Sequence, residues 1–292
     1  MVTTGVHVSI AGSLEKSVTR AEERGCDCFQ IFTRNPRGWQ TKDLTPDVIE
    51  AFITSVKSSG IGPVVDHMPY LPNLASEKED LYTKSVITLI DELHRCETLK
   101  IPFLVTHLGH NQNGDNGREQ VIKAVRSALG SVPGSCRILL ENTAGEKNGI
   151  GSKIADIAAV FNGIDNQNRT GVCFDTCHAF AAGYELRTKE GVSSTIQLID
   201  DAIGLRHLHL IHLNDSTGDL GSGRDRHFHI GLGKIGMQGM YHILHHPVII
   251  CLPLICETPV TDERSDADNI MAVRQIAALQ EIPHNAQQTL VE

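Results

Sequence analysis

The sequence predicts an α/β protein built as a single (β/α)₈ TIM barrel, with a metal site at the carboxyl ends of its strands. Eight short apolar runs alternate with eight segments of helical spacing. Such alternation is typical of parallel strands joined by helical crossovers. In addition, nine His, Asp and Glu residues stand at or just beyond the ends of these runs. An active site shared among many strand ends is typical of this barrel.

The predicted strands are short apolar runs bounded by polar or glycine-containing turns, as in a buried parallel sheet. In chain order they are GVHVSI (5–10), CFQIFT (28–33), PVVDHM (63–68), PFLVTHLG (102–109), RILLEN (137–142), TGVCFDTCH (170–178), LRHLHLIHLND (205–215) and VIICLPLICET (248–258). In the seventh run, we expect His207 and His209 to fill inner layers of the barrel and His212 to reach its mouth.

Each run is followed by a segment with helical spacing of its apolar residues. In order, these segments are 13–25, 43–60, a long helix within 77–99, 118–129, 152–163, a helix near 194–203, 237–246 and 266–279. A doubly wound open sheet is the structural alternative, but it would gather its ligands at one switch point. Candidate ligands at nearly every strand end therefore favour the barrel.

Composition places the chain among ordinary globular proteins. Of its 292 residues, 40% are hydrophobic and 21% are charged, and no run approaches the roughly 18 apolar residues of a membrane helix. We expect a cytoplasmic monomer that does not contact membranes. The eight cysteines lack a C-x-x-C pair, and a chain of this length can bury a core without disulfides, so we expect reduced thiols.

The domain organisation predicted is one catalytic barrel over residues 1–280 and a polar C-terminal tail over 281–292. Two long loops interrupt the alternation, at 34–42 and 214–236. Glycine-containing loops of this length in a compact domain are usually functional or disordered. The second loop carries candidate ligands, which favours function.

The candidate ligands are five histidines and four carboxylates: His67, His107, Glu141, Asp175, His178, His212, Asp225, His227 and Glu257. This set suits zinc, manganese or iron. Glu141 and Glu257 end apolar runs, where an unpaired anion is costly to bury. Carboxylates at this density would repel one another unless cations lay between them, so we expect two or three metal ions.

Each of these residues also has an ordinary structural interpretation. Asp175 and His178, three residues apart, could serve different ions, or Asp175 could cap a helix that contains His178. The Asp225-x-His227 pair could belong to a solvated loop. A lone histidine such as His67 is most often a capping or solvated residue. The metal interpretation depends on the convergence of all nine residues at one face.

Seven motifs together resemble the endonuclease IV family of metal-dependent abasic-site endonucleases. They are HMPYLPN (67–73), THLG (106–109), LENTAG (140–145), FDTCHAFAAGY (174–184), HLNDS (212–216), RDRHFHIGLGKIG (224–236) and ETP (257–259). The resemblance covers roughly residues 5–280. It implies cleavage of the phosphodiester 5′ to an abasic site in double-stranded DNA, leaving a 3′-hydroxyl and a 5′-deoxyribose phosphate, and removal of blocked 3′ ends.

The resemblance also implies three zinc ions, for which Mn²⁺ or Fe²⁺ are chemically acceptable substitutes. The three implied ligand groups are His67, His107 and Glu141; Glu141, Asp175, His212 and Glu257; and His178, Asp225 and His227. Glu141 and Glu257 are the implied catalytic residues. Closely spaced ions can generate the nucleophile and stabilise both the attacking and leaving oxygens, so no side-chain nucleophile is needed.

Recognition of DNA is expected from the loops. The resemblance implies that Arg37 inserts into the base stack, and that Tyr70 and Leu71 wedge into the minor groove. Arg226, between two candidate ligands, is expected to hold a phosphate. A formal net charge of −9 argues against a general nucleic-acid binder. Three divalent ions would reduce that charge to −3 and concentrate positive charge at the site.

The main alternative is a metal-dependent sugar isomerase or epimerase of the same barrel superfamily. Such enzymes also place Glu, Asp and His at strand ends, but usually hold one or two metals. The third ligand group and the Tyr70–Leu71 pair argue against this alternative. A non-catalytic binder of damaged DNA would be expected to have lost at least one ligand, whereas all nine are present.

Overall fold

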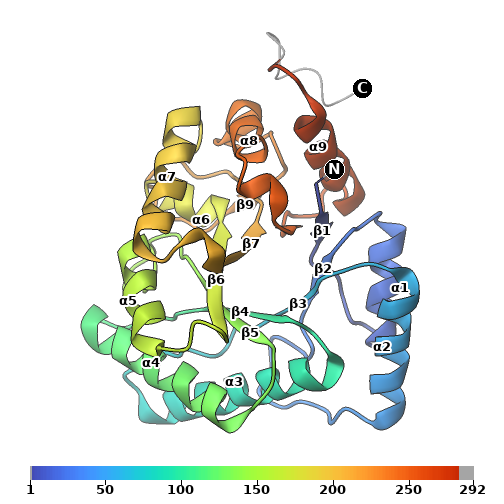
Figure 1. Ribbon diagram of the computed structural model, residues 1–292, viewed down its shortest axis with the longest axis vertical. Coiled ribbons are helices and arrows are strands. Elements are labelled where there is room, and N and C mark those ends of the chain that lie inside the picture. Colours follow the sequence, from blue (N-terminus) through green and yellow to red (C-terminus); the bar gives the residue numbers. More distant parts are fainter. Residues whose placement is uncertain (1, 283–292) are drawn as a thin grey trace.

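A parallel eight-stranded sheet forms the centre of the protein, and helices surround it on the outside (Figure 1). The computed structural model describes residues 2–282. The strands follow the order β1-β10-β7-β6-β5-β4-β3-β2, and a parallel bridge between His7 and Gln30 joins the two ends into a barrel. The strands are β1 (Thr4–Val6), β2 (Phe29–Ile31), β3 (Val64–His67), β4 (Phe103–His107), β5 (Arg137–Glu141), β6 (Thr170–Asp175), β7 (Leu208–His212) and β10 (Leu254–Cys256). The predicted TIM-barrel class is confirmed.

Helices cover the outer face of the sheet and bury their apolar sides against it. They are α1 (Glu15–Glu23), α2 (Pro46–Ser59), α3 (Glu79–Leu99), α4 (Gly114–Ser131), α5 (Ile154–Ile164), α6 (Thr176–Ala181), α7 (Lys189–Ala202), α8 (Gly236–Leu244) and α9 (Asp266–Ala278). Among the described residues, no helix is long and apolar enough to span a membrane. The eight cysteines are free thiols, and only Cys251 is exposed.

The inside of the barrel is filled by side chains that alternate along the strands. One buried layer consists of Cys28, Val65, Val105, Leu139, Cys173, Leu210 and Ile255. Five candidate ligands lie two residues further along these strands, namely His67, His107, Glu141, Asp175 and His212. They point to the same inner face as the apolar layer, because side chains in a strand alternate between its two faces. The apolar layer therefore forms the floor below a polar mouth.

Several element boundaries differ from those predicted. The sixth strand ends at Asp175, because its side chain accepts a hydrogen bond from the His178 backbone N–H (2.7 Å) and caps α6. The seventh segment begins with a 3₁₀ turn, η1 (Leu205–His207), and its pairing with β6 shifts register after Val172. His207 consequently packs against Phe161 of α5, so the expectation that it fills the barrel was wrong. His209 stacks on Phe103 of β4, in line with the expectation for that residue.

The eighth strand also starts later than predicted, after the 3₁₀ turn η2 (Ile249–Cys251). Most of the predicted polar tail at 281–292 falls on residues 283–292, which lie outside the described residues.

The long loop after β7 is ordered around Asp215. A two-stranded hairpin of β8 (Asp215–Ser216) and β9 (His227–Phe228) starts and closes the loop. The buried Asp215 carboxylate accepts hydrogen bonds from the backbone N–H groups of Ser216, Gly233, Ile235 and Gly236. These contacts hold the segment that carries Asp225 and His227 at the barrel mouth.

Closure of the barrel depends on Gly5. A Cβ atom at this position would lie 1.6 Å from the backbone oxygen of Cys28, so only glycine lets β1 approach β2 this closely.

We predict that Gly5→Ala lowers the urea midpoint of unfolding, since overpacking costs about 1–3 kcal/mol. Gly130→Ala is the matched control, because its Cβ would meet no atom within 4 Å. That variant should unfold at the same or a higher urea concentration, and equal midpoints for all three proteins would contradict the prediction.

Candidate metal centre

The nine predicted ligands come together at one end of the barrel. Five of them occupy the last positions of β3, β4, β5, β6 and β7, which are His67, His107, Glu141, Asp175 and His212. Glu257 follows β10 directly, His178 lies in α6, and Asp225 and His227 come from the loop after β7. Their ligand atoms form three groups, each with all atoms within 4.8 Å of one another. These groups match the three sets implied by the resemblance.

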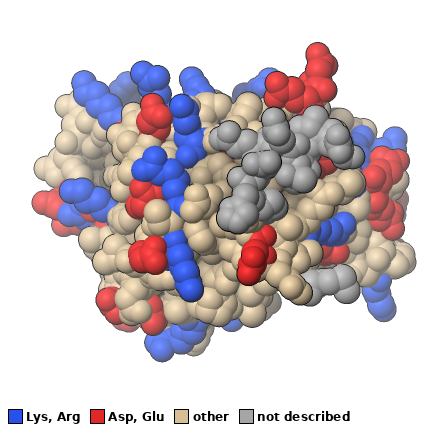
Figure 2. All heavy atoms as spheres, turned by 90° about the horizontal axis from the view of Figure 1, so that it is seen from above, with Lys and Arg blue, Asp and Glu red and all other residues tan. Residues whose placement is uncertain are grey.

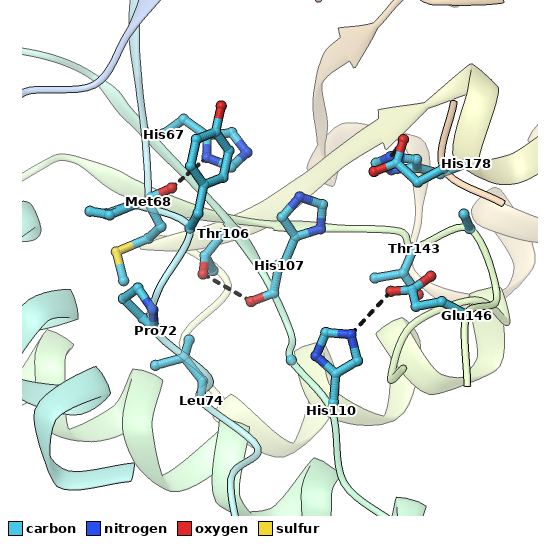
Figure 3. A pocket seen from close by; sticks show the side chains of 15 residues that line it. His67, Met68, Pro72, Leu74, Thr106, His107, His110, Thr143, Glu146 and His178 are labelled. Atoms are coloured by element: carbon cyan, nitrogen blue, oxygen red, sulfur yellow. Dashed lines mark hydrogen bonds and ion pairs between the residues drawn. The ribbon is translucent and has the colours of Figure 1, made fainter. Parts of the chain in front are cut away.

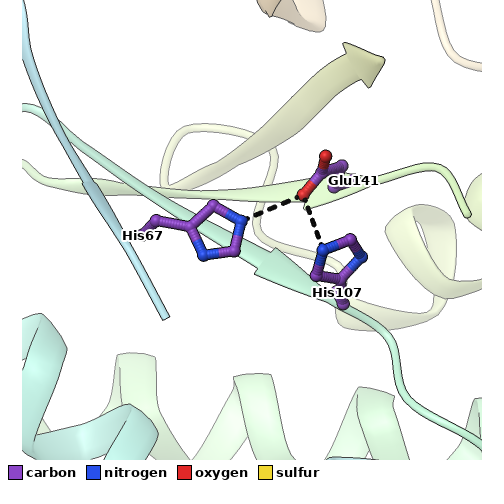
Figure 4. Close-up of side chains that lie close together, drawn as sticks. All are labelled: His67, His107 and Glu141. Carbon is purple, nitrogen blue, oxygen red and sulfur yellow. Dashed lines mark hydrogen bonds and ion pairs between the residues drawn. The ribbon is translucent and has the colours of Figure 1, made fainter. Parts of the chain in front are cut away.

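The first group consists of His67, His107 and Glu141 (Figure 4). Both imidazole Nε2 atoms face the same carboxylate oxygen, Glu141 Oε2, at 3.2 Å from His67 and 3.4 Å from His107. His67 and Glu141 are buried, whereas the His107 side chain is 44% exposed. The group is therefore open to solvent on the His107 side.

The second group shares Glu141 with the first. The other carboxylate oxygen, Glu141 Oε1, lies 2.8 Å from His212 Nδ1. That nitrogen is also 3.2 Å from Glu257 Oε2 and 4.0 Å from Asp175 Oδ2. Since the two oxygens of Glu141 face different groups, its carboxylate can bridge two cations.

The third group is more exposed and includes two residues of the long loop. Asp225 Oδ1 lies 3.3 Å from Nε2 of His178 and 3.3 Å from Nε2 of His227. The Asp225 side chain is 56% exposed and that of His178 is 2% exposed. His227 Nε2 also lies 3.6 Å from Asp175 Oδ2, which connects this group with the second.

The electrostatics of the mouth favour a cation. Burial alone raises the pKa of Glu141, but the nearby imidazoles of His107, His212 and His67 overcome this effect and hold its pKa well below the usual value. Burial lowers the pKa of His178, yet Asp175, Asp225 and Glu141 raise it well above the usual value. The carboxylates thus create a buried place where positive charge is stabilised, as a divalent metal site requires.

The donor set fits zinc, manganese or iron better than a thiolate site. Two cysteines lie close enough to join the groups, Cys173 beside His212 and Cys177 beside His227. Burial raises the pKa of each of these thiols to about 12, so a cation would bind there only by displacing the thiol proton. The histidine and carboxylate side chains are the donors that the sequence predicts.

Four of the five histidines are oriented through their second ring nitrogen. Nδ1 of His67 donates to Met68 O (2.7 Å), Nδ1 of His178 to Asn142 O (2.9 Å), and Nδ1 of His227 to Glu257 O (3.1 Å). Nε2 of His212 instead faces the side-chain oxygen of Gln30 (2.8 Å). Such bonds fix the tautomer, so that the remaining nitrogen of each ring can bind a metal.

Sequence reasoning missed several polar residues that hold the ligands. Asn214 donates to Asp175 Oδ2 (2.7 Å) and accepts from the Glu257 backbone N–H (2.8 Å). Asn142 accepts from the Asp175 backbone N–H (2.7 Å). Both asparagines lie inside quoted motifs, and Gln30 is a polar residue within an apolar run. For Gln30, the signal in the sequence is a polar side chain in the middle of an otherwise apolar strand.

The residues expected to contact DNA lie around the open side of the mouth. A cavity of about 320 Å³ opens beside the first and third groups, lined by His67, His107, His178, Asp225 and Tyr70 among others (Figure 3). The Tyr70 and Leu71 side chains are 65% and 38% exposed. Arg37 and Arg226 are exposed as well. All four therefore remain accessible to a large ligand.

The loops that carry Arg37 and Tyr70 are linked to each other and to the barrel. The backbone N–H of Tyr70 donates to Pro36 O (3.1 Å), and the ring of Tyr70 contacts the edge of Phe32, with centroids 5.0 Å apart. Phe32 in turn contacts His67. The exposed tyrosine thus stands on a packed support that reaches the first ligand group.

Arg95 on α3 holds both ends of the loop that contains Arg37. Its guanidinium donates to Thr33 O (2.5 Å) and to Thr33 Oγ1 (2.8 Å) at one end, and to Lys42 O (3.0 Å) at the other. Beside it, the buried Arg34 pairs with the buried Glu92. The loop at 34–42 is therefore fixed at its base by charged hydrogen bonds, although its tip is exposed.

Comparisons with known proteins agree with this geometry. A family model described as xylose isomerase-like TIM barrel matches residues 18–280. A curated relative from Methanoculleus marisnigri, named "Probable endonuclease 4", is 57% identical over 280 residues, which is 95% of this chain and 99% of the relative. A second with the same name, from Nitrosopumilus maritimus, is 47% identical and covers 94% of this chain and 99% of its own.

Solved structures give the same result. Endonuclease IV from Thermus thermophilus superposes with a TM-score of 0.84 at 35% identity, over 94% of this chain and 98% of that one. A D-tagatose 3-epimerase-like protein has a TM-score of 0.69 at 21% identity, over 93% of this chain and 96% of that one, which shows a common fold alone. The chain therefore belongs to the endonuclease IV family of xylose isomerase-like TIM barrels.

Proposed function

We propose that this protein hydrolyses the phosphodiester 5′ to an abasic site in double-stranded DNA, leaving a 3′-hydroxyl and a 5′-deoxyribose phosphate, and that it also cleans blocked 3′ ends. The observation that carries the proposal is the set of three neighbouring ligand groups, two of which share Glu141. The names of the relatives and of the Thermus structure, all endonucleases, support the same substrate class. We also propose that the protein acts as a monomer in the cytoplasm, since the three ligand groups are complete within one chain.

The proposed cofactor is three Zn²⁺ ions per chain, with Mn²⁺ or Fe²⁺ as possible substitutes. When bound, closely spaced divalent ions supply a nucleophile derived from water and stabilise the attacking and leaving oxygens of a phosphodiester. His67 and His107 would hold one side of this centre, His212 and Asp175 the middle, and His178, Asp225 and His227 the other side.

Glu141 and Glu257 are the proposed catalytic carboxylates. Glu141 has no exposed surface and faces two groups with its two oxygens, so we assign it the task of holding the ions of both groups next to each other. Glu257 faces His212 at 3.2 Å and completes the second group with a negative charge. Neither carboxylate needs to attack the substrate.

Recognition is proposed to depend on distortion of the DNA at the damaged site. Tyr70 and Leu71 are exposed apolar side chains at the rim, and such wedges unstack bases at a cost of a few kcal/mol. A missing base lowers that cost, which selects abasic sites. Arg37 enters the base stack and Arg226 holds a phosphate beside the third group.

One face of the protein gives no support to a DNA track across it. On the face seen in Figure 2, Lys and Arg lie among Asp and Glu and form no continuous basic band over the visible described residues. At the mouth, bound divalent ions would concentrate positive charge and so attract phosphate.

The sugar isomerase alternative is supported by similarity of fold, since three epimerase or epimerase-like structures that superpose on the chain are 21%, 13% and 14% identical to it. The third ligand group and the exposed Tyr70 have no evident task in binding a free sugar. We therefore keep this activity as an outcome of the first experiment.

Incision of a labelled duplex with one tetrahydrofuran abasic analogue tests the proposal. The analogue cannot undergo β-elimination, so a nick on its 5′ side with a 3′-hydroxyl must be hydrolytic. We expect that product, about three metal ions per chain on the same sample by mass spectrometry, and loss of activity on chelation. Glu257→Gln is the inactive control, because it removes one negative charge from the second group while the fold is retained. No nick from a fully metallated protein would redirect the search to keto sugars.

Tyr70→Ala tests the wedge. We predict that its dissociation constant for an abasic duplex rises about tenfold or more at fixed salt, because stacking on an aromatic side chain is worth about 1–3 kcal/mol, while its metal content is unchanged. Ile87→Ala is the matched control, since Ile87 is an exposed apolar residue (53%) of α3 that is not part of the ligand groups. Equal affinity of Tyr70→Ala and wild type would remove the wedge from the proposal.

Arg95→Met tests whether the loop at 34–42 must be fixed for DNA binding. Hydrogen bonds to charged groups are worth about 1.5–3 kcal/mol, so their loss should free the loop and weaken binding of the abasic duplex about tenfold. Hydrolysis of a small activated phosphodiester, which does not reach the loop, should stay near the wild-type rate. Arg126→Met on α4 is the matched control. A parallel loss on both substrates would indicate a general structural defect and contradict a loop-specific role.

A further inference from the structure

We propose that Gln30 is a positioning residue that orients two ligands of the second group, His212 and Glu257, for a divalent ion. The inference rests on the proposed metal centre and assigns a task to β2, a strand without any of the nine candidate ligands. Gln30 is fully buried at the point where β1 and β2 close the barrel.

One amide contacts three side chains, one at the end of β7 and one just beyond each of β1 and β10. The Oε1 atom of Gln30 lies 2.8 Å from His212 Nε2. Its Nε2 atom donates to Glu257 Oε1 (2.6 Å) and lies 3.0 Å from Nδ1 of His7. An amide has one acceptor oxygen and two donor hydrogens, so these three contacts engage the oxygen and, with His7 Nδ1 as an acceptor, both hydrogens.

The surroundings determine which way the amide points. If its oxygen and nitrogen exchanged places, the oxygen would face the carboxylate of Glu257, and two acceptors would meet without a proton. In the observed orientation, Oε1 accepts the proton of His212 Nε2. The lone pair of His212 Nδ1 then faces Glu141 and Glu257, where the proposed ion would bind.

Gln30 differs in kind from the partners of the other ligand histidines. His67, His178 and His227 are oriented by backbone carbonyl groups, which no substitution removes. The tautomer of His212 depends on a side chain. We therefore expect loss of the Gln30 amide to weaken metal binding in the second group and to leave the other two groups unchanged.

Gln30→Met provides the direct test, because methionine has a similar length but cannot accept from His212 or donate to Glu257. Metal ions per chain are measured on the zinc-loaded protein after equilibration with graded concentrations of chelator. Loss of a partner that orients a metal ligand costs about 10–100-fold in metal affinity. We expect one ion per chain to leave at a correspondingly lower free-chelator concentration, while the other two leave as in wild type.

A second variant separates orientation from a defect in folding. Gln30→Glu keeps an acceptor oxygen for His212 but places a carboxylate next to Glu257. In protein labelled with ¹⁵N-histidine and loaded with zinc, the Nε2–H signal of His212 should persist in wild type and Gln30→Glu, and should be lost or broadened by exchange in Gln30→Met. Gln197→Met, at an exposed glutamine of α7, is the matched control for both measurements.

The outcomes distinguish this inference from the metal centre on which it rests. A wild-type protein that binds no metal would overturn the metal centre and this role of Gln30 with it. Three ions in wild type and an unchanged chelator profile in Gln30→Met would overturn the role of Gln30 alone. Equal weakening of all three ions, or the same His212 signal in both Gln30 variants, would also overturn it.

Discussion

A single carboxylate without exposed surface, that of Glu141, is the constraint on which the site depends. Burial of an anion is costly unless it is paired, and Glu141 ends a strand inside the barrel, away from lysine or arginine. Four imidazoles surround it, those of His67, His107, His178 and His212. These rings come from three other strands and from α6. The closed barrel is what brings them to one anion, so the chemistry of the mouth and the integrity of the sheet are inseparable.

The site is built in two parts that differ in rigidity. The first two groups stand on strand ends above a packed apolar layer. In the second group, Asn214 donates to the Asp175 carboxylate, and Asn142 accepts from the Asp175 backbone N–H. The third group takes two of its ligands from a long loop. That loop keeps its shape because the Asp215 carboxylate accepts four backbone N–H groups. A loop with such an internal anchor can supply ligands almost as well as a strand.

Recognition and chemistry are also physically connected in this protein. Phe32 lies between Tyr70 at the rim and His67 in the first group, and it packs on His7 as well. If DNA binds against the exposed tyrosine as proposed, it would press on a packed aromatic cluster and not on a free loop. An acidic chain can act on DNA in this arrangement, because four carboxylates at the mouth attract divalent ions and those ions, once bound, attract phosphate.

The sequence by itself determined the fold class, the catalytic face and the nine residues that converge there. It could do so because strands, helices and ligand types leave local signals, namely periodicity, capping residues and buried charges at strand ends. The sequence did not reveal features that depend on residues distant along the chain. These are the shift of register that turns His207 outwards and the hydrogen bonds of Arg95 that fix the loop at 34–42. A third is the Gln30 amide, which connects the residues just beyond β1 and β10 with the end of β7. Only the tertiary structure decided these, since closing a barrel places residues more than 180 positions apart within hydrogen-bonding distance.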